Sequence, residues 1–535
     1  MRQRPALRIL AIFALVAAAT IPLVRAQQAA PPAAKPQEAR PAGPAPAATA
    51  PVQESLSVTD HTIRIKGQVI PYKASSGTIL LRNDKGEPIG LMYAAAYTRS
   101  DVKDLSARPV AFFYNGGPGS ASLWLHLGAF GPRRVSTVDA AFTPPAPYAL
   151  VDNAETLLDK TDMVFVDAMG TGYSRIAGQG EPKDFFGIDE DAIAFAQFIR
   201  TYISRNGRWN SPKFLVGESY GTFRSAALAQ ILQSREGMHL NGVVLISSVL
   251  DLATITFGAG DDRPFIFYLP SYAAVAWYHG ALKDRPADLE AFLAEVRDYA
   301  KGEYAAALFK GAALAPAEKR AVAAKLSAYT GLAADYWIKA DLRVTLAQFN
   351  VELERDRGLT TGRIDARFTG FTRDLLAENA QGDPEGPAVG GAYTALVNVY
   401  NHQELRYGQD MTYNTSLRGG RDWNWRRQPA TGGFPGAPAT SGGFFPGSPN
   451  VQGDLAQAMI TNPKLLVQVE NGYYDMATPF FATEFTMGHL GLPTELQGHL
   501  TLDYYPAGHM MYLHDESRVK LHDNIAAFID RATAR

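Results

Sequence analysis

Hydrophobic and polar positions follow two rhythms along this chain. Between residues 61 and about 98 they alternate with a period of two, which predicts an antiparallel meander with turns at 75–77 and 83–86. Short, continuously apolar runs follow, and such runs are typical of parallel strands that are buried on both faces. These runs are residues 110–114, 163–166, 214–216, 243–246 and 465–469.

Stretches with helical periodicity, such as residues 189–204, lie between several of the apolar runs. This alternation predicts an α/β fold, with a mainly parallel central sheet and helices on both of its faces. The core is expected in two parts, residues 55–254 and 451–535.

The interval 255–450 between these two parts breaks the alternation. We interpret it as an inserted, largely helical cap over the carboxyl ends of the strands, where the ligands of open α/β sheets lie. Its helical stretches are residues 289–299, 316–328 and 344–355, and it ends in a Gly/Pro-rich loop at residues 431–449.

The first residues have the pattern of a secretory signal peptide, which we place at 1–26. Three arginines precede an apolar run at 9–24, and the small-residue pattern Val24-Arg25-Ala26 ends it. The run is short for a membrane span and contains Pro22, so an uncleaved anchor is the alternative. Residues 27–54 are rich in Ala and Pro and predict a linker without a core of its own.

Composition excludes several classes of protein. The 535 residues are 46% hydrophobic and carry a formal net charge of −2, so we expect no nucleic-acid partner. No second segment has the length and apolarity of a membrane span. The chain has no cysteine, which rules out disulfides and thiolate metal sites. We expect an exported bacterial protein of the periplasm or the medium, and the oligomeric state stays open.

The sequence Gly-Glu-Ser-Tyr-Gly at 217–221 is the strongest chemical signal. It lies between the apolar run at 214–216 and a helical stretch at 222–233. A G-x-S-x-G between a strand and a helix is the setting of a nucleophile elbow, in which a strained turn exposes the serine hydroxyl. Ser219 is therefore the expected nucleophile.

A serine hydroxyl needs a base, which in this type of fold comes last in the chain order Ser, Asp or Glu, His. His509 follows a strand-like stretch at 500–505 and a short turn. His499 precedes that stretch, and His514 lies in a more polar one. We expect His509 to be the base.

The acid that orients the base should follow the preceding strand. Asp475 lies a few residues past the apolar run at 465–469, where a carboxylate could reach the imidazole. Glu470 is the local rival but is still at the strand's end. The alternative is that Asp475 has a structural role only and caps a helix or turn before Pro479.

A Gly-rich turn at 115–119, Asn-Gly-Gly-Pro-Gly, follows the first apolar run. Exposed amides on such a turn, with the amide of the residue after the nucleophile, would form an oxyanion hole. We assign Gly117 N–H and Tyr220 N–H to it; a plain tight turn is the alternative.

With these residues in place, the chain resembles the serine carboxypeptidase family (peptidase family S10) of the α/β-hydrolases. Four blocks in family order carry the likeness, at 115–122, 166–174, 217–221 and 507–510, together with Asp475. The resemblance implies removal of C-terminal residues from peptides with a free C-terminus, through an acyl-enzyme and without a metal or organic cofactor.

The resemblance also assigns roles to individual residues. It makes Ser219 the nucleophile, His509 the general base and Asp475 its orienter. Asn115 and Glu218, with Gly116 beside them, would bind the substrate's terminal carboxylate. Since a protonated Glu218 can donate to a carboxylate and an ionised one repels it, we expect binding to favour acidic pH.

The chain departs from the family pattern at three positions. Ser120 and Phe113 replace a cysteine and a tryptophan found in many members. A second glutamate, which pairs with the one beside the nucleophile in well-known members, has its place by spacing near Ala129. We therefore expect this acid pair to be absent, which concerns the exopeptidase specificity and the pH optimum rather than the catalytic chemistry.

Two other functions stay open. The same catalytic residues with a different pocket would make an esterase or an acyltransferase. If the protein is not an enzyme, the alternative is a non-catalytic exported binding protein. The aromatic and cationic segment 422–427 is predicted to wall a side-chain pocket or to hold a carboxylate through arginine, with plain packing as the alternative.

Overall fold

The computed structural model describes residues 52–417, 422–427 and 448–534. The expected signal peptide at 1–26 lies outside the described residues, as do nearly all of the linker and most of the Gly/Pro-rich loop at 431–449. Among the helices of the described segments, none is both long enough and apolar enough to cross a membrane.

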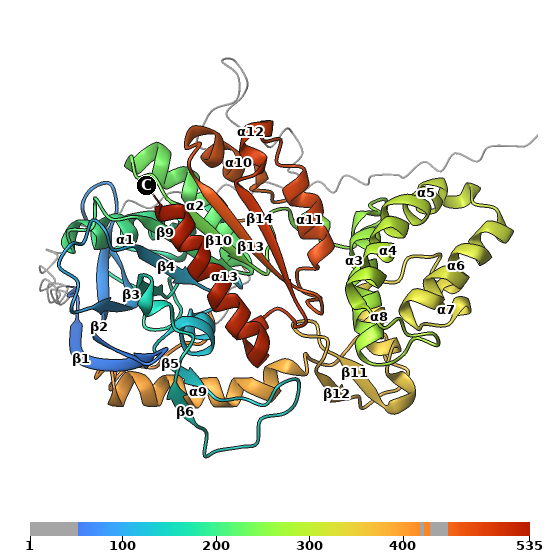
Figure 1. Cartoon of the computed structure of the whole chain (residues 1–535), viewed down its shortest axis with the longest axis horizontal. Helices are drawn as coiled ribbons and strands as arrows, with labels where there is room; N and C mark the ends of the chain where they lie inside the picture. The colour runs from blue at the N-terminus through green and yellow to red at the C-terminus, as the bar shows by residue number, and fades with distance from the viewer. Residues whose placement is uncertain (1–51, 418–421, 428–447, 535) are drawn as a thin grey trace, which may run out of the picture. The chain divides into compact units, whose positions relative to one another are not determined.

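A ten-stranded sheet forms the centre of the described part of the chain (Figure 1). Its order is β1-β2-β3-β7-β4-β9-β10-β13-β14, and β8 pairs with β3. The six strands from β7 to β14 are mutually parallel, and β1, β2 and β3 form an antiparallel meander at one edge, as predicted. The strands are β1 Leu56–Ile65, β2 Gln68–Arg82, β3 Pro88–Arg99, β4 Val110–Tyr114, β7 Asp162–Val166, β8 Arg175–Ile176, β9 Lys213–Glu218, β10 Gly242–Ile246, β13 Leu466–Gly472 and β14 Leu500–Tyr505.

One predicted turn of the meander is wrong. Residues 75–77 lie inside β2, and the chain reverses earlier, at Lys66-Gly67. The hydroxyls of Ser76 and Tyr93 lie 2.6 Å apart on neighbouring strands, so the polar side chain is satisfied within the sheet. Pairing with β1 and β3 therefore overrides the local turn preference of Ser and Gly. The predicted turn at 83–86 is present, closed by a hydrogen bond from the Gly86 amide to the Asn83 carbonyl.

Side chains alternate between two apolar layers, one on each face of the sheet. Along β4, Ala111 and Phe113 pack into one layer, and Phe112 and Tyr114 pack into the other. The first layer lies under α9 (Glu385–Gln403) and α13 (Asp515–Thr533). The second lies under α1 (Ile188–Arg205), α2 (Tyr220–Glu236) and α10 (Gln452–Thr461).

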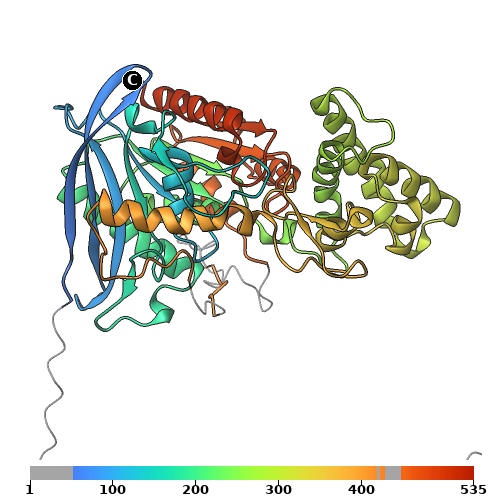
Figure 2. The ribbon, with the colours of Figure 1, turned by 90° about the horizontal axis from the view of Figure 1, so that it is seen from below.

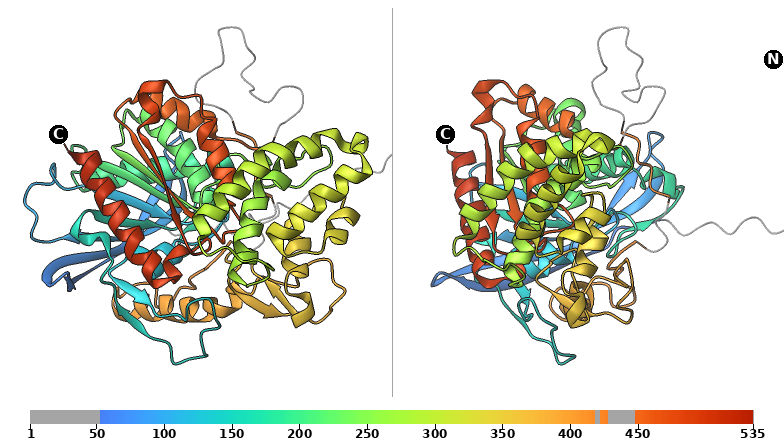
Figure 3. Two further views of the ribbon diagram at one scale, coloured as in Figure 1. Left: turned by 45° about the vertical axis from the view of Figure 1, so that its right-hand side comes forward. Right: turned by 90° about the vertical axis from the view of Figure 1, so that its right-hand side faces the viewer.

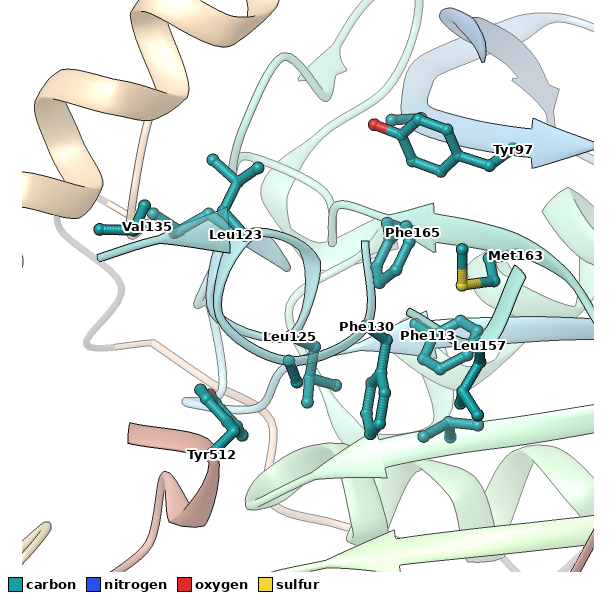
Figure 4. Packing of buried hydrophobic residues seen from close by; sticks show 14 of the residues in the cluster. Tyr97, Phe113, Leu123, Leu125, Phe130, Val135, Leu157, Met163, Phe165 and Tyr512 are labelled. Carbon is teal, nitrogen blue, oxygen red and sulfur yellow. The ribbon is translucent and has the colours of Figure 1, made fainter. Parts of the chain in front are cut away.

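Phe113 illustrates how tightly the first layer is packed. Its ring stacks on that of Phe165 at 4.8 Å between centroids and lies 5.4 Å from that of Phe130 (Figure 4). The aromatic residue that stands where family members carry tryptophan is therefore part of the core.

The interval predicted as a cap consists of two different parts. Helices α3 to α8 form one group, and α3 packs against α11 (Phe480–Gly488) and the segment that follows β13 (Figure 3). Helix α9 instead lies across the strands of the central sheet (Figure 2). A short hairpin of β11 (Leu359–Thr361) and β12 (Thr369–Phe371) lies between these parts in the sequence. The helices of the group are α3 Arg263–Tyr278, α4 Leu289–Tyr299, α5 Ala305–Lys310, α6 Pro316–Thr330, α7 Ala334–Lys339 and α8 Leu346–Glu352.

Candidate active site

Ser219 occupies a strained turn between β9 and α2. Its backbone has φ 61° and ψ −130°, a conformation that a residue with a side chain adopts only when its surroundings impose it. A Cβ on Gly217 would overlap the Gly221 carbonyl, so the turn requires glycine there. The Ser219 amide donates to the Ile246 carbonyl at 3.0 Å, which fixes the turn to the end of β10.

His509 and Asp475 lie at the carboxyl ends of the last two strands. The imidazole Nδ1 is 2.8 Å from Oδ2 of Asp475, a carboxylate with no exposed surface. Oδ1 of Asp475 accepts hydrogen bonds from the amides of Ala477 and Thr478. The Thr478 hydroxyl donates to Oδ2 at 2.6 Å. With its oxygens engaged in this way, the carboxylate is held in one orientation toward the ring.

The pKa of His509 is raised above its ordinary value. Burial alone would lower the pKa, but the charge and the hydrogen bond of Asp475 outweigh that effect, and Glu218 adds to the increase. The Arg363 guanidinium acts in the opposite direction. The imidazolium form, which a general base must pass through, is therefore stabilised at this position.

The hydroxyl of Ser219 and the ring of His509 are not joined by a hydrogen bond among the described residues. The histidine is held from its backbone side instead, where its carbonyl accepts from the Ser247 hydroxyl at 2.7 Å. Contacts between nucleophile and base are often loose in unliganded hydrolases and tighten when substrate is bound.

The Gly-rich turn after β4 packs directly against the elbow. A Cβ on Gly116 would overlap the Tyr220 nitrogen, so the two loops approach as closely as glycine allows. Gly117 has φ 109°, in the region that favours glycine. Neither the Gly117 nor the Tyr220 amide donates to a backbone carbonyl in the part of the chain that the structure describes. Both donors are thus available to an oxygen of a ligand.

Glu218 is buried beside the elbow and is held by Asn115. The Asn115 side-chain amide donates to Oε1 of Glu218 at 2.7 Å, and its carbonyl oxygen accepts from the Leu125 amide. Oε2 of Glu218 is buried without a hydrogen-bond partner in the described residues. Burial raises the pKa of Glu218 to about 7, although His509, Tyr512 and Asn115 each lower it. Tyr512 acts on this carboxyl at close range without forming a well-aligned hydrogen bond with it.

The position that spacing assigns to the second glutamate of the family pattern is Ala129. Ala129 is buried in the apolar layer under the sheet, on the helical turn Leu125–Phe130. A different carboxyl, Glu385 at the start of α9, is almost fully buried, and its Oε1 has no partner among the described residues. Burial raises the pKa of Glu385 well above its ordinary value. The charges of three other carboxyls, one of them Glu218, raise this pKa further. Sequence reasoning missed Glu385 because no local pattern marks it.

Asp167 connects two of the family blocks. Its Oδ1 accepts from the Ser122 amide at 2.7 Å and from the Tyr413 hydroxyl at 3.2 Å. Burial raises the pKa of Asp167 to about 7. The block at 166–174 therefore holds the end of the block at 115–122 through Ser122.

The rival acid Glu470 makes a separate contact. It lies within β13, where its Oε2 accepts from the Tyr505 hydroxyl at 2.7 Å. Burial raises the pKa of Glu470 to about 8. The structure joins His509 to Asp475 rather than to this residue.

The segment 422–427 lies next to the elbow. The rings of Trp423 and Trp425 meet the Tyr220 ring edge-on, at 5.6 and 6.1 Å between centroids. Arg427 forms ion pairs with Asp189 and Asp454, so its charge is already compensated. Trp423 also packs against the apolar layer on this face of the sheet, so the structure shows packing and ion pairing for these residues.

Together, the sheet order, the serine elbow and the His–Asp pair at successive strand ends define an α/β-hydrolase fold. Residues 71–296 match the family model of the serine carboxypeptidases. The structure is similar to that of the prohormone-processing carboxypeptidase KEX1(delta)p of Saccharomyces cerevisiae, and the superposition includes 85% of this chain. That superposition covers 91% of the yeast chain, with a TM-score of 0.50 and 15% identity.

Two curated relatives with carboxypeptidase names match this chain at low sequence identity. The chain is 25% identical to serine carboxypeptidase-like 45 of Arabidopsis thaliana over 240 residues, 43% of this chain and 45% of the relative. It is 30% identical to carboxypeptidase sxa2 of Schizosaccharomyces pombe over 138 residues, 25% of each chain. The matches span less than half the length of these relatives. They support the serine carboxypeptidase family, while the superposition bears on the fold alone.

Proposed function

We propose that this protein is a serine-type carboxypeptidase that releases C-terminal residues from peptides through an acyl-enzyme. The observation that carries the proposal is the pairing of two features at one elbow. Ser219 stands in the strained turn near the hydrogen-bonded His509 and Asp475, and the preceding residue, Glu218, is a buried carboxyl held by Asn115.

In the first half of the reaction, Ser219 Oγ attacks the carbonyl carbon of the last peptide bond while His509 Nε2 takes its proton. The negative charge on the carbonyl oxygen is stabilised by the amides of Gly117 and Tyr220. His509 then gives the proton to the leaving amine, and the C-terminal residue departs.

In the second half, a water molecule loses a proton to His509 and attacks the acyl-enzyme. The ester bond to Ser219 breaks, and its oxygen recovers the proton. Asp475 keeps the imidazole in the tautomer that carries the proton on Nδ1, so that Nε2 can accept. The buried pair of His509 and Asp475 is suited to this, because its geometry is fixed before substrate arrives.

Selection of a free C-terminus is assigned to Asn115, Gly116 and Glu218. A carboxyl with a pKa of about 7 is partly protonated near neutral pH and can donate a hydrogen bond to the terminal carboxylate. The unpartnered Oε2 of Glu218 is the atom that would make this bond.

Labelling with a fluorophosphonate tests the nucleophile. We expect one labelled site in the folded protein, lost in Ser219→Ala and retained in Ser204→Ala. Ser204 is an exposed serine of α1 whose hydroxyl donates to the Arg200 carbonyl and accepts from the Trp209 indole. Absence of labelling in folded wild-type protein would refute the serine hydrolase.

A substrate series then tests the peptidase. N-blocked dipeptides with a free carboxylate should be cleaved with a higher kcat/KM than the same dipeptides as C-terminal amides. Turnover of simple esters with no cleavage of the peptide acids would favour an esterase on the same scaffold.

We further propose that the chain is exported, to the periplasm or the medium, on the strength of the signal-like pattern at 1–26. N-terminal sequencing of the protein recovered from cell fractions tests this, since a cleaved form should begin near residue 27. Recovery of the intact N-terminus in the cytoplasmic fraction would contradict it.

A further inference from the structure

The loop of the β11–β12 hairpin (Figure 1), residues 362–368, hydrogen-bonds to the loop that carries the proposed base. The His509 amide donates to the Ile364 carbonyl at 2.8 Å. The neighbouring Gly508 amide donates to Oδ2 of Asp365 at 3.2 Å. A Cβ on Gly508 would overlap the backbone and Cβ of Asp365, so the two loops are in direct contact.

The same hairpin loop also holds the segment that carries Asp475. The Met476 amide donates to the Arg363 carbonyl at 3.1 Å, and the Ala366 amide donates to the Tyr474 carbonyl at 3.0 Å. One short segment of the insertion is thus bonded to residues on both sides of the acid and to the base itself.

Asp365 and Arg367 give this loop its shape. Both are buried, and the Arg367 guanidinium binds both carboxylate oxygens of Asp365 at 2.6 to 3.0 Å. A second carboxylate, Asp139, lies 3.1 Å from the same guanidinium. A bidentate Arg–carboxylate pair of this kind fixes orientation more strictly than a single ion contact.

We propose that Asp365 and Arg367 are positioning residues that set the distance between the proposed base and acid, so that the insertion takes part in catalysis. The inference rests on the proposed function. Asp365 is the link that matters most, because one of its oxygens serves the Gly508 amide and the guanidinium together. Without it, the loop with His509 loses the contact at the Gly508 amide.

The decisive variant is Asp365→Asn, which keeps the volume but places an amide where Gly508 and Arg367 both donate. We expect kcat for a peptide substrate to fall about 10²-fold, the usual cost of misplacing a catalytic group by about 1 Å, with KM within twofold of wild type. The rate of fluorophosphonate labelling should fall with it. All rates are taken per active site, by titration of the labelled protein.

The pH profile distinguishes positioning from a general loss of structure. The charged groups that act on His509 are Asp475, Glu218 and Arg363. Since Asp475 is the one that raises its pKa most, loosening their contact should move the acid limb of kcat/KM to lower pH. A wild-type kcat and an unmoved acid limb in Asp365→Asn would overturn the proposal.

Arg367→Lys covers the case in which Asp365→Asn does not fold. Lysine keeps the charge but cannot form the bidentate pair with Asp365. We therefore expect a smaller fall in kcat, about tenfold, and a shift of the acid limb in the same direction. Wild-type rates and acid limb in this variant would also overturn the proposal.

Asp162→Asn is the matched control. Asp162 is as buried as Asp365 and binds two arginines, Arg108 and Arg208, but it begins β7 at the opposite end of the parallel strands. It should lose stability while keeping kcat and the acid limb per folded molecule. Failure of the proposed function would show as wild-type protein that is not labelled or that cleaves no peptide acid, and both outcomes are separate from all of these.

Discussion

Nδ1 of His509 lies 2.8 Å from Oδ2 of Asp475, although the two residues are 34 positions apart in the chain. They meet because β13 and β14 are adjacent parallel strands whose carboxyl ends reach the same edge of the sheet. The carboxylate is fully buried and its oxygens are occupied by Ala477, Thr478 and the ring. The direction of the imidazole is therefore set before any substrate binds.

Asp475→Asn should lower kcat by about 10⁴-fold, because an amide in this place favours the wrong histidine tautomer. Thr478→Val, which removes only the hydroxyl bonded to Oδ2, should cost far less. Steady-state kinetics with thermal unfolding as a check on folding would measure both. Asp475→Asn that kept a tenth of the wild-type kcat would contradict the assigned role.

The KM for peptide acids should rise as pH increases through about 7. Burial raises the pKa of Glu218 to that value, so the carboxyl is neutral and able to donate below it and is charged and repulsive above it. The KM for matched C-terminal amides or esters should stay flat. In Glu218→Gln the KM for peptide acids should not depend on pH between about pH 5 and pH 9. A rising KM in that variant would assign the effect to another group.

His509 limits the same profile from the acid side. As a base it must be neutral, and its raised pKa makes kcat/KM fall as the solution becomes acidic. The two groups together predict a bell-shaped profile near neutrality for peptide acids. Tyr512→Phe removes a hydroxyl that lowers the pKa of Glu218, so the alkaline limb should move to higher pH. A limb that stays in place would show that Tyr512 does not act on this carboxyl.

Gly116→Ala should lower kcat by 10² to 10³-fold, about the cost of losing one oxyanion donor, because its Cβ would overlap the Tyr220 nitrogen. Gly390→Ala is the control: an added Cβ on α9 meets nothing within 4 Å and should stabilise the helix by about 0.5–1 kcal/mol. Kinetics per titrated active site and thermal unfolding separate the two effects. Unchanged kcat in Gly116→Ala would remove the Tyr220 amide from the proposed oxyanion hole.

Glu470→Gln should flatten the pH dependence of stability. Burial raises the pKa of Glu470 from an ordinary 4.5 to about 8, so the folded state binds a proton more tightly than the unfolded state. The free energy of unfolding therefore falls as pH rises between these values, by about 1.4 kcal/mol per pH unit. The variant should resemble wild type at pH 5 and be more stable by several kcal/mol at about pH 9.

Urea unfolding at both pH values would measure this difference, with Glu378→Gln, an exposed carboxyl of the insertion, as the control. If wild-type protein and Glu470→Gln lost stability in parallel as pH increased, another group would be responsible.

Much of the core was predictable because its strands are buried on both faces. Continuous apolar runs such as Val110–Tyr114 match their strands with little error, and α4 begins and ends as its periodicity predicts. The elbow was predictable for a related reason: strand, glycines, serine and helix are all local in sequence. By contrast, the turn predicted from the serines and glycine at 75–77 was wrong. Pairing between strands outweighs turn preference when the polar side chain finds a hydrogen-bond partner.

Contacts between distant segments were beyond the sequence. The two parts of the insertion, α9 on the sheet and the hairpin loop on His509 and Asp475, depend on packing that no local pattern encodes. The burial of Glu385, which raises its pKa, is set in the same way. The raised pKa values of Glu218 and Glu470 likewise follow from burial and not from residue type.

The sequence by itself determined the chemical groups, their order along the chain and the strand ends that carry them. Only the tertiary structure decided which carboxyl faces the imidazole, which carboxyls have raised pKa values and how residues 362–368 meet the loops that carry His509 and Asp475. The physical reason is that hydrogen bonds and desolvation act over a few ångströms in space, whereas a sequence pattern records only neighbours along the chain.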